Sequence, residues 1–262
     1  MKKTRFWSWF WMFLGGLYFF VPLYATLRFS LMMKKDVLSF MAYEKVIHDP
    51  KFLEAFSFSA QMAILTILVS LVLVVPTAYW VHLRLPKLKP IMEFITMLPF
   101  VIPAIVLVFG LIRSYSKPPL LLVSSPALLV AAYVVLALPY MYRSVDVGLR
   151  AIDVRALTEA AQSLGASWPR ILFQVIFPNL RSALLGGTFL TFAIVIGELT
   201  IANSLAWKAL GPYMTTLAGM KAYEPAALAV MSFALTWGSI AVLQFVGKGR
   251  GGAAPENMAG MH

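Results

Sequence analysis

One ionisable residue stands well inside the apolar segments of the sequence: Glu198, in the run FAIVIGELTIANSL. An ionisable side chain within a membrane span is costly and is by default a hypothesis for function. A carboxylate that faces a central passage would attract a cationic substrate, whereas one that caps a broken helix or pairs with a neighbouring span would be structural. Asn203 and Tyr140 join Glu198 as candidate residues of a substrate pathway.

Residue patterns for catalysis and metal binding are missing from the sequence. It contains no G-x-x-x-x-G-K-[ST], no H-E-x-x-H and no G-x-S-x-G. His48, His82 and His262 are far apart, and cysteine is absent. We therefore predict no catalytic residue, no cofactor and no metal site, and a membrane-bound enzyme would lack a nucleophile–base set.

The composition is that of a membrane protein. Hydrophobic residues make up 60% of the chain and charged residues only 13%, against roughly 25% charged in soluble domains. Six segments reach the length of about 20 apolar residues that a span requires: Phe6–Met33, Phe58–Val81, Ile91–Ile112, Ala127–Val147, Ala183–Leu205 and Ala226–Val246. The predicted fold class is an all-α polytopic membrane protein with six transmembrane helices.

Three parts are expected along the chain. Residues 1–57 hold the first span and an external segment, residues 58–247 hold a core of five spans, and residues 248–262 form a disordered tail rich in Gly and Ala. The external segment contains AYEKVIHDPKFLEAF, which is typical of a short pair of surface helices. The connector 148–182, inside the core part, is the longest polar interruption after residue 57.

Basic residues are spread unevenly between the two sets of connectors. The set that includes the N-terminus holds the larger share, for example Arg84, Lys87 and Arg155. Because cytoplasmic loops are enriched in Lys and Arg, we expect both termini in the cytoplasm and the chain in contact with membrane lipid. The net charge of +11 is scattered rather than gathered in one stripe, so nucleic acid is not an expected partner.

The connector 148–182 has the pattern of two short amphipathic helices joined by a glycine. Helical spacing places Leu157, Ala160 or Ala161, and Leu164 on one face. Gly165 ends the first helix, as expected for a glycine at the C′ position. Ser167 is a candidate cap for the second helix, which we expect to end at Pro178. An interfacial hairpin or a protein-docking element would both explain this amphipathicity.

The residue string in this connector resembles the EAA loop of binding-protein-dependent ABC importer permeases. The matching residues are Glu159-Ala160-Ala161, Gly165 at the family's distance, and Val175-Ile176-Phe177-Pro178, with Val175 for isoleucine and Phe177 for leucine. The loop also lies between the fourth and fifth predicted spans, as in that family. The resemblance extends from about Phe58 to Val246.

The resemblance implies the type I permease fold and a position in the bacterial cytoplasmic (inner) membrane. In that family the helix before the glycine docks in a groove of a cytoplasmic ATPase and transmits its closure to the spans. The implied coupling residues are Glu159, Ala160, Ala161, Leu164, Gly165 and Pro178. The implied partners are ABC ATPase subunits, a second permease subunit that is identical or paralogous, and an extracytoplasmic substrate-binding protein. ATP hydrolysis would then reside in a separate subunit.

The substrate expectation rests on the fifth span. Its acidic residue and the chain length look most like the spermidine/putrescine-type permeases, which implies a polyamine or another small polar solute. Relatives in that group handle aminoethylphosphonate, ferric iron, sulfate or thiamine, and these stay open as alternatives. An ATP-independent six-helix secondary transporter or channel would carry polar residues paired across internal repeats near the midplane, and the sequence shows none.

Three smaller features have structural interpretations. Pro99 and Pro103 should kink the third span. The pair Gly186-Gly187 should permit close helix approach in the fifth span. Arg143 and Asp146 are expected to pair with each other at the end of the fourth span.

Overall fold

The computed structural model of the chain describes residues 2–34 and 37–248, with side chains described for 7–34 and 37–238. Every named element in these residues is helical, which confirms the all-α fold class. The tail expected at 248–262, with His262, lies outside the described residues except for Lys248. The chain divides into two compact units, residues 1–55 with 212–237 and residues 56–211 with 238–262.

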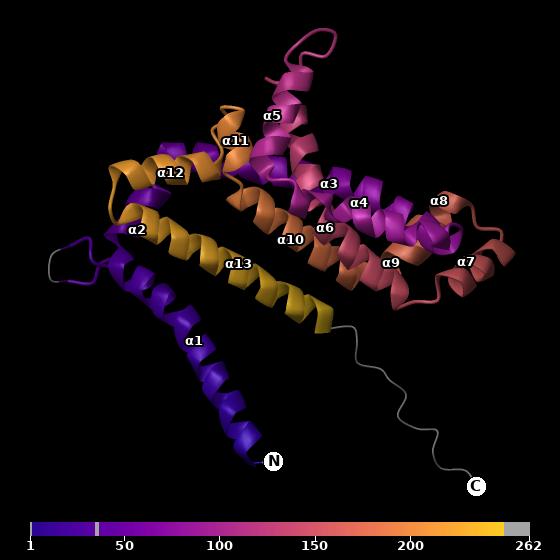
Figure 1. The fold of residues 1–262 in the computed structure, drawn as a ribbon, viewed down its shortest axis with the longest axis horizontal. Helices are drawn as coiled ribbons and strands as arrows, with labels where there is room; N and C mark the ends of the chain where they lie inside the picture. Colours follow the sequence, from indigo (N-terminus) through magenta and orange to yellow (C-terminus); the bar gives the residue numbers. More distant parts are fainter. Residues whose placement is uncertain (1, 35–36, 249–262) are drawn as a thin grey trace. The chain divides into compact units, whose positions relative to one another are not determined.

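The first unit is built from the two ends of the chain. Its helices are α1 (Lys2–Ser30), α2 (Met41–Ile47), the start of α3 (Pro50–Leu83), most of α12 (Leu210–Met220) and α13 (Glu224–Lys248) (Figure 1). Phe29 stacks on Tyr223 with ring centroids 4.9 Å apart, and the Tyr213 hydroxyl donates to Asp49 Oδ2 at 2.8 Å. Burial and the nearby Asp49 carboxylate raise the pKa of Tyr213. Of the short helix pair expected in the external segment, α2 is a separate helix, whereas the second part is the start of the 34-residue α3.

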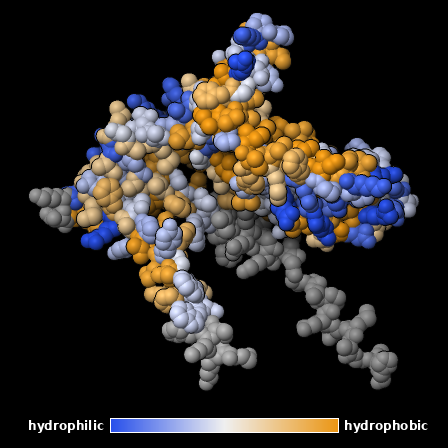
Figure 2. Space-filling view, in the orientation of Figure 1, coloured by the Kyte–Doolittle hydropathy of each residue, from blue (hydrophilic) through white to orange (hydrophobic). Residues whose placement is uncertain are grey.

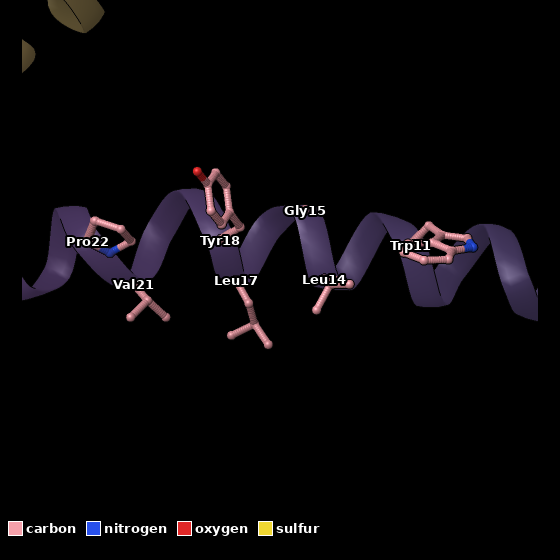
Figure 3. Close-up of a pocket in the computed structure, with 7 residues that line it drawn as sticks. All are labelled: Trp11, Leu14, Gly15, Leu17, Tyr18, Val21 and Pro22. Atoms are coloured by element: carbon pink, nitrogen blue, oxygen red, sulfur yellow. The ribbon is translucent and has the colours of Figure 1, made fainter.

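Helix α1 is apolar and largely uncovered by the rest of its unit. A shallow hollow runs along it, lined only by α1 residues: Trp11, Leu14, Gly15, Leu17, Tyr18, Val21 and Pro22 (Figure 3). The side chains of Trp11 and Tyr18 are 61% and 85% exposed. A helix with this composition and exposure is typical of a lipid-facing span.

The second unit contains the packed core and the long connector. Its helices are α3, α4 (Lys89–Val101), α5 (Ala104–Tyr115), α6 (Pro126–Arg150), α7 (Val154–Ser163), α8 (Trp168–Arg170), α9 (Phe177–Asn179), α10 (Arg181–Gly197) and α11 (Thr200–Ser204). A 3-10 turn covers Pro86–Leu88, and a π-helical turn covers Ile171–Ile176 between α8 and α9. Helix α10 packs along α6 (Figure 1). One apolar cluster joins α3, α6, α7 and the start of α10 through side chains such as Tyr79, Met141 and Ala161.

Small residues bring α6 and α10 together. A Cβ added to Gly187 would lie 3.1 Å from Ser144 Cβ, and one added to Gly148 would lie 2.6 Å from Ala183 Cβ. Gly187 therefore allows the close approach predicted for the Gly186-Gly187 pair. Gly186 has only ordinary space around it, with Ser144 Oγ 3.9 Å away.

Two predicted spans are broken rather than continuous. By length and composition, three helices in the part of the chain with described side chains could each span a membrane: Trp7–Ser30 in α1, α3 and α6. The number rises to five if each of two bent helix pairs is counted as one span. The predicted third span consists of α4 and α5, which meet at 97° beside Pro103 (Figure 1). Pro103 thus marks the predicted bend, while Pro99 lies inside α4. The sixth predicted span lies in α13, whose side chains are described only to residue 238.

The predicted fifth span, Ala183–Leu205, is wrong as a continuous helix. Helix α10 ends at Gly197, and the separate short helix α11 begins at Thr200. Glu198 and Leu199 lie between them, with Glu198 in extended backbone geometry (φ −74°, ψ 126°). The stretch between the fifth and sixth predicted spans contains a further helix, α12, which was not predicted from the sequence.

Candidate functional site

The helix that carries the Glu159-Ala160-Ala161 string is α7. Its N-terminus is capped by Asp153, whose Oδ1 accepts a hydrogen bond from the Ala156 N–H at 3.0 Å. An N-cap of this kind satisfies one of the free N–H groups at a helix start. The cap therefore helps to stabilise α7, which has only 10 residues.

The face of α7 that is buried against the chain is not the stripe singled out from the sequence. The buried residues are Val154, Thr158 and Ala161, spaced at i, i+4 and i+7. Of the predicted stripe, Leu157 is half-buried, whereas Ala160 is exposed and Leu164 is 88% exposed. The helix therefore carries two stripes: the first packs against the core of the chain, and the second, the stripe singled out from the sequence, stays largely uncovered.

The second stripe is consequently free on the outside of the molecule. At about 100° per residue, Leu157, Ala160 and Leu164 lie roughly a quarter-turn away from the buried stripe, and exposed Glu159 lies on a different side again. Ala161 packs inward and does not belong to the outer surface. Figure 2 shows hydrophilic residues gathered around α7 and α8.

Gly165 ends α7 as predicted. It has φ +76°, the left-handed region that side chains with a Cβ rarely adopt. The Ala166 N–H donates to the Ala161 carbonyl at 3.0 Å and the Gly165 N–H to the Gln162 carbonyl at 2.9 Å. These two bonds form a Schellman motif, the common glycine-dependent helix end.

The helical segment after Gly165 ends at Asn179, one residue beyond the predicted end at Pro178. Ser167 occupies the N-cap position of α8, and the helical path continues through the π turn to Asn179. Pro178 lies inside α9. It stands in the first turn of that helix, directly after the π-helical turn, a position in which proline is tolerated. Trp168 in this segment packs against Trp80 of α3 with ring centroids 4.7 Å apart.

A charged cluster ties α3, α4 and α6 together beside the connector. His82 Nε2 lies 2.8 Å from Asp146 Oδ1, Arg150 Nε lies 2.9 Å from Asp146 Oδ2, and an Arg150 Nη lies 2.7 Å from Glu93 Oε1. The predicted Arg143–Asp146 pair is therefore wrong. Arg143 is exposed, whereas the i, i+4 spacing of Asp146 and Arg150 places both on one face of α6.

Glu198 caps the break between α10 and α11. Its Oε1 accepts a hydrogen bond from the Ile201 N–H at 2.8 Å and its Oε2 one from the Ala202 N–H at 3.0 Å. The buried Tyr133 of α6 also hydrogen-bonds the Glu198 side chain. A carboxylate at a helix N-terminus is stabilised by the free N–H groups and the helix dipole. The geometry matches the helix-capping alternative considered from the sequence.

The other two candidate pathway residues lie in separate surroundings. Tyr140 is half-buried and packs edge-on against Phe100 of α4, with ring centroids 5.4 Å apart. Asn203 is exposed on α11. The tyrosine that reaches Glu198 is instead Tyr133. Both tyrosines lie on α6, one two turns after the other. Sequence spacing alone does not tell which of them faces Glu198, because the position of Glu198 depends on the break between α10 and α11.

Solved structures share this fold. A bacterial ABC transporter involved in the import of the acidic polysaccharide alginate has a TM-score of 0.66 at 17% identity, covering 96% of this chain and 98% of that chain. An amino acid ABC transporter has a TM-score of 0.56 at 17% identity, covering 81% of this chain and 99% of that chain. These similarities show the fold.

Sequence relatives are transport permeases. The chain is 27% identical over 179 residues to the molybdate/tungstate transport system permease protein WtpB of Pyrococcus abyssi, covering 68% of this chain and 71% of the relative. It is 36% identical over 69 residues to the methionine import system permease protein MetP of Bacillus subtilis, covering 26% of this chain and 31% of that relative. Neither relative is a polyamine permease by name.

The family assignment follows from a sequence profile that matches more than half of the chain. The sequence profile described as "binding-protein-dependent transport system inner membrane component" matches residues 86–248, which include α4 to α13 and therefore both the α7 connector and the Glu198 break. The chain belongs to this family of membrane permeases of ABC importers.

Proposed function

We propose that this chain forms one half of the translocation pathway of an ABC importer and is driven through α7 by a cytoplasmic ATPase. The observation that carries the proposal is the division of α7 into two apolar stripes. One stripe, Val154, Thr158 and Ala161, attaches the helix to the chain's own core. The other presents Ala160 and Leu164 to the outside, while exposed Glu159 lies on a further side of the same helix.

This arrangement suits a mechanical contact. An exposed leucine next to a tight glycine turn is an anchor that a partner's apolar pocket can accept, because seating it there removes apolar surface from water. The inward stripe joins α7 to the apolar cluster of α3, α6 and α10, so a force on the anchor reaches these helices. In this proposal Glu159 pairs at the rim of the contact, Gly165 shapes the turn, and Pro178 lies near the end of the helical segment after Gly165.

The complete assembly extends beyond this chain. We expect six spans with both termini in the cytoplasm, a second permease subunit that is identical or paralogous, two ATPase subunits and an extracytoplasmic substrate-binding protein. The family description itself names dependence on a binding protein. ATP hydrolysis belongs to the partner subunits, and alternating access would come from rocking of the two permease halves.

Co-purification with the ATPase subunit encoded beside this chain tests the proposal. Leu164→Glu and Glu159→Arg should lose the ATPase, because the first places a charge in the apolar contact and the second reverses the charge at its rim. The matched control is Leu121→Glu, since Leu121 is also exposed (67%) but lies in the connector between α5 and α6. If wild type retains no ATPase, or if Leu164→Glu binds as well as Leu121→Glu, α7 is not the docking helix.

The substrate is proposed to be a small polar solute. The polyamine expectation came from the acidic residue of the fifth span and the chain length, and both oxygens of the Glu198 carboxylate accept backbone N–H groups. The pathway residues Glu198, Asn203 and Tyr140 stay a prediction, with Glu198 shaping the path through the helix break. Calorimetric titration of the purified binding protein with molybdate, methionine and spermidine separates the classes. Binding of spermidine alone would restore the polyamine assignment.

A further inference from the structure

A buried hydrogen bond joins the connector helix α7 to α3. The Tyr79 hydroxyl and Thr158 Oγ1 are 2.8 Å apart, and each residue is only 2% exposed. Thr158 Oγ1 also donates to the Val154 carbonyl at 2.6 Å. A threonine hydroxyl has one hydrogen to donate, so Thr158 accepts from Tyr79 in this arrangement.

The surroundings of this pair are apolar. Val75 and Ala78 of α3, Val145 and Leu149 of α6, and Ala161 of α7 belong to the same buried cluster. A hydroxyl in such surroundings is costly unless it is hydrogen-bonded, so the two groups hold each other in place. Apolar packing alone is non-directional, whereas this bond fixes how α7 is rotated about its own axis.

The rotation of α7 decides which residues face outward. Thr158 directly precedes Glu159 and Ala160, and Leu164 follows at the end of the same helix. We propose that Tyr79 is a positioning residue: its hydroxyl locks α7 onto α3, so that α7 keeps its rotation, and α3 moves with it, when the ATPase engages. This inference rests on the proposed function, because it assumes that the ATPase docks on α7 and moves it.

Distance measurements between spin labels on α3 and α7 test the lock. The sequence contains no cysteine, so Thr77→Cys and Arg155→Cys, both at exposed positions, provide a unique label pair. In the wild-type complex with its ATPase, the distance distribution should be narrow and unchanged between nucleotide-free and ATP-bound states. Tyr79→Phe and Thr158→Val should broaden it or shift it on ATP binding, whereas Thr158→Ser, which keeps the hydroxyl, should restore the narrow distribution.

The double variant and a matched control complete the design. The double variant Tyr79→Phe with Thr158→Val should broaden or shift the distance distribution no more than either single variant does, because each of the three variants removes the same hydrogen bond. Thr66→Val is the control: Thr66 is fully buried in α3, but its hydroxyl bonds only the Met62 carbonyl of its own helix. It should leave the label distance unchanged.

The outcomes separate the two proposals. If wild type retains the ATPase and Tyr79→Phe gives the wild-type distance distribution in both nucleotide states, Tyr79 is not a positioning residue while the docking proposal stands. Tyr79 is likewise no positioning residue if Thr66→Val broadens the distribution as much as Tyr79→Phe. If wild type retains no ATPase, the docking proposal itself fails, and the claim about load on α7 falls with it.

Discussion

Gly211 lies directly against the backbone of Leu199, and a Cβ added to Gly211 would stand 2.9 Å from the Leu199 Cα. Real Cβ atoms essentially never approach another atom this closely. The neighbouring Leu210 N–H donates to Ser59 Oγ of α3 at 2.8 Å. The start of α12 therefore contacts both the break between α10 and α11 and helix α3.

Gly211→Ala should destabilise the protein by about 1–3 kcal/mol, the usual cost of forcing an extra methyl group into a packed site. The atoms in the way belong to backbone, which cannot turn aside as a side chain can. Thermal unfolding of the purified protein in detergent measures the effect. Gly219→Ala is the control, because Gly219 lies in the same helix with open space around its Cα, and it should be neutral or slightly stabilising.

Glu198→Ala should lower stability by about 0.5–2 kcal/mol, the range for loss of an N-cap. The Ile201 and Ala202 N–H groups would lose their acceptor in a buried place. Glu198→Gln keeps one side-chain oxygen and should keep most of this stability and of the transport activity. If Glu198→Gln instead folds like wild type but abolishes uptake of a cationic substrate, the carboxylate faces the passage and the capping role is secondary.

The sequence predicted local features well and pairings between helices poorly. The end of α7 at Gly165 could be predicted because a helix end often needs a residue with positive φ, and glycine is the residue type that adopts this conformation most easily. The break at Glu198 could not, because an apolar run of the right length fits a continuous span, and only tertiary contacts with Tyr133 and Gly211 show where it is interrupted. The buried stripe of α7 was missed for the same reason. Both stripes are apolar, and the core of the chain determines which one is covered.

Ala206→Gly should raise the stability of the protein by about 1 kcal/mol. Ala206 has φ +58°, and among the described residues it is the one residue other than glycine with a positive φ. It occupies the C′ position after α11, where the Trp207 N–H donates to the Ala202 carbonyl at 2.9 Å as Ala166 does to Ala161 after α7. A residue with a Cβ costs about 1–2 kcal/mol in this conformation, offset in part by the greater flexibility of glycine in the unfolded chain.

Gly165→Ala is the converse substitution at the equivalent position and should lower stability by about 1 kcal/mol. There is open space around Gly165, so the cost would come from the backbone angle and not from a clash. Thermal unfolding of the two variants side by side checks both signs. Equal effects of the same sign would mean that the left-handed turns do not control the stability of these helix ends.

Asp146→Ala should be the most damaging change in the charged cluster, with a loss of about 1–3 kcal/mol, because it leaves the buried His82 ring without its hydrogen-bond partner. Asp146 is 1% exposed and serves both His82 and Arg150, and His82 is itself only 6% exposed. Glu93→Gln removes an acceptor that is 40% exposed, where solvent screens the charge, so its effect on unfolding should be small. Thermal unfolding in low and high salt distinguishes the two: the Asp146→Ala loss should persist in high salt, and any Glu93→Gln loss should disappear. A Glu93→Gln variant as unstable as Asp146→Ala would show that the exposed limb of the cluster holds α4 to α6.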